Sequence, residues 1–232
     1  MSTTDDLLDE IFDDKRNALY AEFAAWVRES RRFKAFASTY RAKIRSKLKN
    51  VRDDGAMQDL RAELETGALL LRDDRFTLEY EKYAAAKQRG PDFTVTFKTH
   101  TAFNVEVRRV RTIELSDSNA DVRSGKLMSV LCDKVGQMPP SIVNLLWLRT
   151  GGEISEAELT RAVTALRQLA EGKAEDYFRR RGFESAAGFL KQYRQLSGIV
   201  LRQPGEQVIW INPLARHKPA PEIVTAVRRL AG

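Results

Sequence analysis

Two carboxylates in the middle of the chain have a spacing that suits a divalent metal ion. Asp92 follows Pro91 at the start of one segment of alternating apolar and polar residues, and Glu106 lies in the next such segment, with thirteen residues between the two acids. Alternation of this kind is typical of half-buried β-strands. If the two segments pair as a hairpin, both acids lie on one face as diagonal neighbours, about 7–8 Å apart at the backbone. Their oxygens are the ligands that Mg²⁺ or Mn²⁺ prefers.

The expected hairpin has one apolar face and one polar face. Pairing Phe97 with Phe103 leaves residues 98–102 as the loop and aligns Phe93 with Val107. In this register Asp92 faces Arg108, so a cross-strand salt bridge between them is the structural alternative to a metal site. The polar face would carry Asp92, Thr94, Thr96, Asn104, Glu106 and Arg108.

The residues Pro91-Asp92 and Glu106-Val107-Arg108 resemble the signature of the PD-(D/E)xK nuclease superfamily, which has Pro-Asp on one strand and Glu-x-Lys on the next. The resemblance covers roughly residues 57–150 and departs from the pattern at Arg108, where the superfamily has lysine. It implies a metal-dependent nuclease that hydrolyses phosphodiester bonds in nucleic acid, with DNA favoured. It also implies an α/β fold, with a restriction-endonuclease-like α-β-β-β-α-β core and a mixed central sheet.

Further residues of the expected site follow from the same resemblance. The superfamily has an acid on the helix before the first strand, and Glu63 is the matching position, as a metal ligand or a proton acceptor. Some members carry the charge-neutralising residue on the helix after the hairpin, so Lys126 or Lys134 is expected to substitute for the missing lysine, with Gln137 touching substrate. Arg108 can hold a phosphate oxygen but cannot accept a proton. Ordinary surface roles remain the alternative for Glu63 and for both lysines.

A basic segment precedes this region. Residues 27–52 contain ten Lys or Arg residues and one acid, with aromatic and aliphatic residues at helical spacing. Such a cluster predicts either a solvated helix face or a surface that contacts nucleic-acid phosphates. The phosphate-contacting candidates are Arg41, Lys43, Arg45 and Lys47.

Periodicity along the chain predicts three regions that form one compact unit. An acidic amphipathic helix is expected to reach about Glu29, with the basic helix after it. The central region should contain a helix over 56–72, a strand over 76–81, whose Glu81 could line the site, and the hairpin. A helix over 119–137, capped at 116–118, and a buried parallel strand over 141–148 should follow. The regions are an N-terminal helical segment (1–55), the nuclease-like core (56–150) and a C-terminal extension of helices and a hairpin (151–232).

Composition limits the classes of function. The chain has 232 residues, 43% of them hydrophobic, a formal charge of +7 and one cysteine, Cys132. These values predict a soluble cytoplasmic protein with an anionic partner, without a disulfide framework or a membrane partner, and they leave a homodimer open. A catalytically inactive nuclease-like fold that binds nucleic acid or protein remains the alternative to the nuclease.

Overall fold

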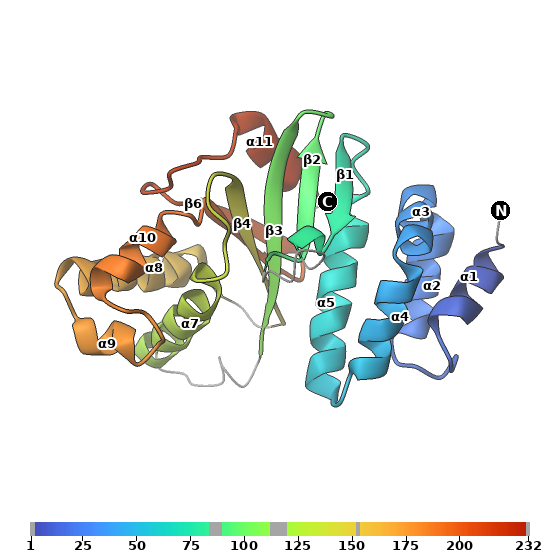
Figure 1. The fold of residues 1–232 in the computed structure, drawn as a ribbon, viewed down its shortest axis with the longest axis horizontal. Helices are drawn as coiled ribbons and strands as arrows, with labels where there is room; N and C mark the ends of the chain where they lie inside the picture. The colour runs from blue at the N-terminus through green and yellow to red at the C-terminus, as the bar shows by residue number, and fades with distance from the viewer. Residues whose placement is uncertain (1–2, 84–89, 112–119, 152–153, 231–232) are drawn as a thin grey trace.

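The computed structural model describes residues 3–83, 90–111, 120–151 and 154–230. Within these ranges a six-stranded mixed sheet runs through the molecule, with helices on both faces (Figure 1). The α/β class with a mixed central sheet is therefore confirmed. The strands lie side by side in sequence order: β1 (Phe76–Tyr80), β2 (Phe93–Phe97), β3 (Thr101–Val110), β4 (Val143–Thr150), β5 (Gly198–Gln203) and β6 (Glu206–Ile211).

The sheet is antiparallel at its two edges and parallel in the middle. The pairs β1–β2, β2–β3 and β5–β6 are antiparallel, whereas β4 lies parallel to both β3 and β5. Leu146, Trp147 and Leu148 of β4 are fully buried, because β4 has helices over both faces. The predicted buried parallel strand is confirmed. Because β5 and β6 extend the same sheet, the C-terminal region completes the central sheet.

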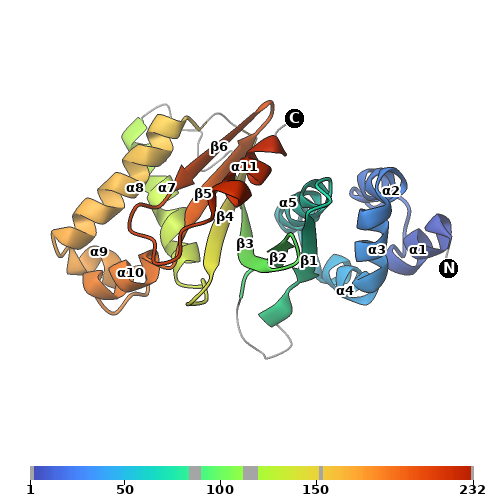
Figure 2. The same cartoon turned by 90° about the horizontal axis from the view of Figure 1, so that it is seen from above.

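Five helices precede the sheet. Helix α5 lies against β1–β3, and the four shorter helices lie on the far side of α5 (Figure 2). At Gly67 of α5 an added Cβ would come within 3.2 Å of the Phe93 ring, so glycine permits this close approach. The five helices are α1 (Thr4–Ile11), α2 (Tyr20–Glu29), α3 (Arg31–Thr39), α4 (Arg41–Asn50) and α5 (Asp54–Leu70).

The prediction of two long N-terminal helices is wrong. The chain leaves the helix at Phe12, whose ring packs 5.3 Å from that of Phe23, and re-enters it after Asn17, whose side chain accepts a hydrogen bond from Leu19 N. The break at Ser30, whose hydroxyl caps α3 by accepting from Phe33 N at 3.1 Å, lies at the predicted boundary, but the basic segment breaks again at Tyr40, between α3 and α4. Aromatic packing between short helices and local capping together override the helical periodicity.

The opposite face of the sheet is covered by helices from the middle and the end of the chain. Helix α8 starts with a reciprocal capping box formed by Ser155 and Glu158. The expected cap at 116–118 lies outside the described residues. These helices are α7 (Ala120–Val135), α8 (Glu156–Glu171), α9 (Glu175–Arg179) and α10 (Ala186–Tyr193), while α11 (Pro221–Arg229) packs on the same face as α5. No helix in the described ranges is long and apolar enough to span a membrane.

Candidate functional site

The hairpin of β2 and β3 differs from the prediction by a shift of two residues. Phe97 pairs with Thr101, and Phe93 with Val105, because Lys98 and Thr99 both adopt positive φ (50° and 72°) and make a tighter turn than the expected five-residue loop. A shift of two preserves the faces, since side chains alternate with a period of two. The predicted apolar face is confirmed, as the aromatic and valine side chains along it are buried.

The shift changes which residue lies opposite Asp92. Continuing the observed register by one residue sets Asp92 opposite Glu106, and the predicted facing of Asp92 and Arg108 is wrong. Asp92 Oδ2 accepts a hydrogen bond from Val107 N at 2.7 Å. The backbone oxygen of Asp92 accepts another from Glu81 N at 2.7 Å. These two hydrogen bonds hold Asp92 between Glu81, which follows β1, and Val107 in β3.

Three acids share this region of the sheet. Burial, followed by the carboxylates of Glu63 and Glu106, raises the pKa of Asp92 well above its usual value, although Val107 N and Lys47 act in the opposite direction. Glu63 comes from α5, Asp92 from the start of β2 and Glu106 from β3. The sequence-predicted acids are thus neighbours whose negative charges interact.

Glu106 is almost fully buried and forms an ion pair with Lys134 of α7. The side chains of Glu106 and Lys134 are 7% and 20% exposed, so this pair is shielded from solvent. Of the two lysines expected to replace the missing motif lysine, Lys134 is the one that the structure brings to the acids. Lys126 lies two helical turns earlier, about 12 Å away along the axis. Gln137 donates to Asp133 O at 3.0 Å, within its own segment.

A second lysine reaches the acids from the other face of the sheet. Lys47 Nζ of α4 lies 2.5 Å from Glu63 Oε1 and 2.6 Å from Glu81 Oε1. It also lies 4.9 Å from the centre of the Tyr80 ring, a cation–π contact. Burial raises the pKa of Glu63 despite Lys47. Sequence reasoning treated Lys47 as a surface residue and did not include Tyr80, because no local pattern connects α4 to the end of β1.

The other cations of α4 form ion pairs within the chain. Arg41 contacts Glu10 at 2.8 Å, and Lys43 contacts Glu81 at 3.4 Å. Arg45 pairs with Asp13. The acidic N-terminal segment thus neutralises much of the basic helix. A nucleic-acid surface on α4 stays a prediction, and its cations would have to exchange these partners for phosphates.

The acids suit a divalent cation by their chemistry. Among the described residues, no three His, Cys, Asp or Glu side chains already form a group that could hold a metal ion. Lys47 and Lys134 contact the carboxylate oxygens instead. The donors are nevertheless hard oxygens of the kind that Mg²⁺ prefers. A cation there would also offset the repulsion that raises the pKa of Asp92.

Comparison of the chain with protein-family models, curated proteins and solved structures found no match. Fold and site together define an α/β protein with a buried cluster of acids and lysines on its central sheet.

Proposed function

We propose that this protein is a metal-dependent nuclease that hydrolyses phosphodiester bonds in nucleic acid, with DNA as the favoured substrate. The observation that carries the proposal is the convergence of Glu63, Asp92 and Glu106 from three elements, with Lys134 paired to Glu106. This is the set of groups that the resemblance to the PD-(D/E)xK superfamily calls for, with the lysine on a helix instead of the strand. A restriction-endonuclease-like core is part of the same proposal.

Each residue has a defined task under this proposal. Asp92 and Glu106 would hold Mg²⁺ or Mn²⁺, with Glu63 as a further oxygen ligand. The bound ion would acidify a water molecule and offset the charge that develops at the phosphate. The alternative task for Glu63 is to accept the proton of that water, since burial raises its pKa above that of an exposed carboxylate.

The cations would act on the phosphate. The Lys134 ammonium, once released from Glu106, can donate a hydrogen bond to a nonbridging oxygen. Arg108 lies two residues beyond Glu106 on β3, so alternation directs it to the same face. Its planar guanidinium can grip two phosphate oxygens, but a guanidinium stays protonated in proteins and cannot remove a proton from water.

The decisive experiment compares cleavage by the wild type and by Glu106→Gln. Plasmid and single-stranded DNA are incubated with Mn²⁺ or Mg²⁺, and products are measured on gels. The variant should lose more activity than the roughly 10–100-fold that loss of an outer-shell partner costs. Glu79→Gln is the matched control, because Glu79 is half-exposed on β1 and pairs only with nearby Lys82 among the described residues. Equal cleavage by wild type and Glu106→Gln, or none by the wild type, would refute the proposal.

A second candidate is a nuclease-like module that binds nucleic acid without cutting it. The observation that favours it is that Lys47 and Lys134 already neutralise Glu63, Glu81 and Glu106, the task of a metal ion in an active enzyme. Such a module should bind DNA with affinity that falls steeply with salt, without cleavage in either metal. Arg41→Gln removes one cation of the basic helix α4 and should then lower the slope of log K against log salt by about one unit.

A further inference from the structure

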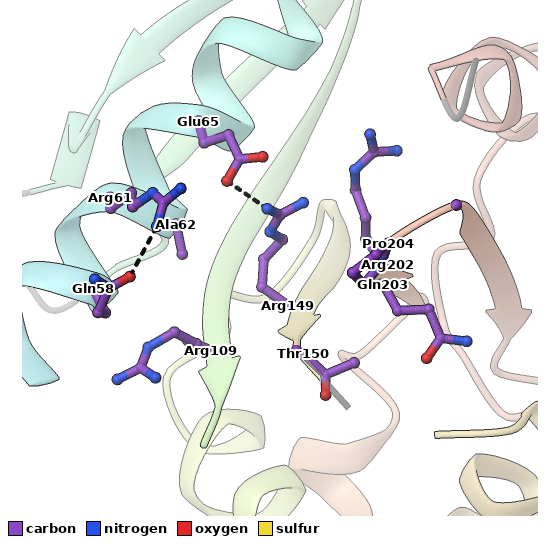
Figure 3. Close-up of a pocket in the computed structure, with 12 residues that line it drawn as sticks. Gln58, Arg61, Ala62, Glu65, Arg109, Arg149, Thr150, Arg202, Gln203 and Pro204 are labelled. Atoms are coloured by element: carbon purple, nitrogen blue, oxygen red, sulfur yellow. Dashed lines mark hydrogen bonds and ion pairs between the residues drawn. The ribbon is translucent and has the colours of Figure 1, made fainter. Parts of the chain in front are cut away.

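A pocket of about 390 Å³ opens between α5 and the carboxyl ends of β3, β4 and β5 (Figure 3). Its volume falls in the range of about 300–1,000 Å³ typical of small-molecule sites. The carboxyl ends of parallel strands are also where open α/β sheets usually bind ligands. The pocket lies on the α5 side of the sheet. Arg109 is the residue of β3 that lines the pocket. Glu106 is three residues earlier on the same strand, and since side chains alternate between the two faces, it points to the opposite side.

The floor of the pocket is a row of three arginines on adjacent strands. Arg109 of β3 aligns with Arg149 of β4, which aligns with Arg202 of β5. Arg149 lies in the middle, and Arg61 reaches towards the row from α5 (Figure 3). Neighbouring strands are about 4.8 Å apart, so the row spans about 10 Å. Like charges on neighbouring strands repel and destabilise the sheet. Negative charge beside the three arginines would reduce this repulsion.

Two arginines of the row have acidic partners on α5. Arg109 Nε lies 2.9 Å from Asp59 Oδ1. Arg149 forms an ion pair with Glu65, which itself lines the pocket. Both arginine side chains are about one-quarter exposed and line the pocket. Their charges are therefore partly balanced by the protein.

Arg202 has no carboxylate partner among the described residues. Its guanidinium donates to two neutral acceptors, Gln207 Oε1 at 3.2 Å and Leu230 O at 3.3 Å. Burial and the nearby charge of Arg149 lower the pKa of Arg202, with Arg72 acting in the same direction. Positive charge is thus in excess at the Arg149–Arg202 end of the row.

We infer that this pocket binds a ligand with linked phosphate groups through Arg149 and Arg202. An arginine fork holds phosphate oxygens in pairs, which suits guanidinium groups arranged side by side. Arg149 and Arg202 lie on adjacent strands about 4.8 Å apart, so the two guanidinium groups can each take a different phosphate of a linked pair. The linked phosphate groups belong either to a small polyphosphate or to the backbone of a nucleic-acid strand. The inference does not rest on cleavage at Glu106, which lies on the other face of the sheet.

Calorimetric titration with pyrophosphate in metal-free buffer tests the inference. The wild type should bind pyrophosphate more tightly than orthophosphate. Arg202→Gln should weaken pyrophosphate binding about tenfold or more, the effect of losing one charge-assisted contact. Arg16→Gln is the matched control, because it removes one positive charge from a side chain that is 91% exposed and forms an ion pair with Asp14. Its affinity for pyrophosphate should equal that of the wild type.

A second variant covers the case in which Arg202→Gln fails to fold. Glu65→Gln releases Arg149 from its ion pair, so pyrophosphate should bind about tenfold more tightly. Glu79→Gln is the matched control, because it removes an acid that pairs with Lys82 at edge strand β1, away from the pocket, and it should bind pyrophosphate as the wild type does. Displacement of pyrophosphate by a short thymidine oligonucleotide would identify a nucleic-acid strand as the source, and pyrophosphate binding without displacement would identify a small polyphosphate. No binding of pyrophosphate by the wild type, or equal affinity in wild type, Arg202→Gln and Glu65→Gln, would overturn the inference.

Discussion

The ammonium group of Lys134 on α7 contacts the carboxylate of Glu106 on β3. Lys47 makes the corresponding contact with Glu63 from the other side of the sheet. Two helices far apart in sequence thus each bring a lysine to the same group of acids. This arrangement affects both the stability of the fold and the binding of a metal ion at the acids.

Lys134→Met should lower the free energy of unfolding by about 2–4 kcal/mol, because it leaves the buried carboxylate of Glu106 without its cation. Urea unfolding at neutral pH measures the loss. Lys134→Met combined with Glu106→Gln should recover most of it, because no unpaired charge then remains. Additive losses in the double variant would mean that the two side chains do not interact in solution.

Glu158→Gln should reduce the dependence of stability on pH at the acid end of the range. Although burial tends to raise it, hydrogen bonds from Ser155 and the Arg123 guanidinium lower the pKa of Glu158. Because the pKa is lower in the folded state, ionised Glu158 stabilises the fold above its unfolded pKa of about 4.3, and the stabilisation disappears as pH falls through the folded pKa. Urea unfolding between about pH 6 and pH 3 should show a shallower slope for Glu158→Gln.

The matched control for this measurement is Glu156→Gln, which removes an exposed acid from the same turn of α8. Its slope should follow that of the wild type. Glu158→Gln should also cost about 1 kcal/mol at neutral pH, since it weakens the capping box of α8. The same slope in both variants would argue against a special role of Glu158.

The thiol of Cys132 should be unreactive in the folded protein. Cys132 is 2% exposed on α7, and burial raises its pKa to about 12. Thiolate is the reactive form, so a chromogenic disulfide reagent at about pH 8 should label the folded chain at least 100-fold more slowly than the chain in urea. Equally fast labelling in both states would show that α7 opens readily, which would weaken the case for a stable Lys134–Glu106 contact.

The sequence was sufficient for the strands but not for all their boundaries. Alternation predicts β1 and β2, and a nearly unbroken apolar run predicts β4. The turn between β2 and β3 was predicted too long, because its tight form depends on Lys98 and Thr99 in the left-handed region, where neither residue is favoured. The N-terminal helix breaks were missed because no proline or glycine marks them.

The site was predictable only as far as short-range patterns reach. Spacing alone places Asp92 and Glu106 on one face of the hairpin, and the superfamily resemblance adds Glu63 and a choice between two lysines. The Lys47–Glu63 contact depends on how α4 packs against α5, and no local periodicity encodes that packing. The row of arginines across β3, β4 and β5 was missed for the same reason, because its alignment exists only in the register of strands that are distant in sequence.

Lys47→Met should increase the stabilisation that a divalent cation gives. Lys47 contacts Glu63 and Glu81, and its charge also acts on Asp92, so its removal leaves the acids with less positive charge. In metal-free buffer the variant should unfold at lower temperature than the wild type. Because Mn²⁺ then has no ammonium to displace at Glu63, the rise in unfolding temperature at a given Mn²⁺ concentration should be larger than for the wild type. Chelation should abolish the rise in both.

Lys82→Met is the matched control, since Lys82 pairs with the half-exposed Glu79 of edge strand β1. Its response to Mn²⁺ should equal that of the wild type, which separates the site from a general effect of lost positive charge. Asp92→Asn should abolish the Mn²⁺ response while keeping an oxygen that can accept the hydrogen bond from Val107 N. The comparison therefore distinguishes a cation held by these carboxylates from one bound loosely at the surface. A rise of the same size in wild type, Lys47→Met and Asp92→Asn would exclude the acids as the metal ligands, because none of the altered charges would then affect the bound ion.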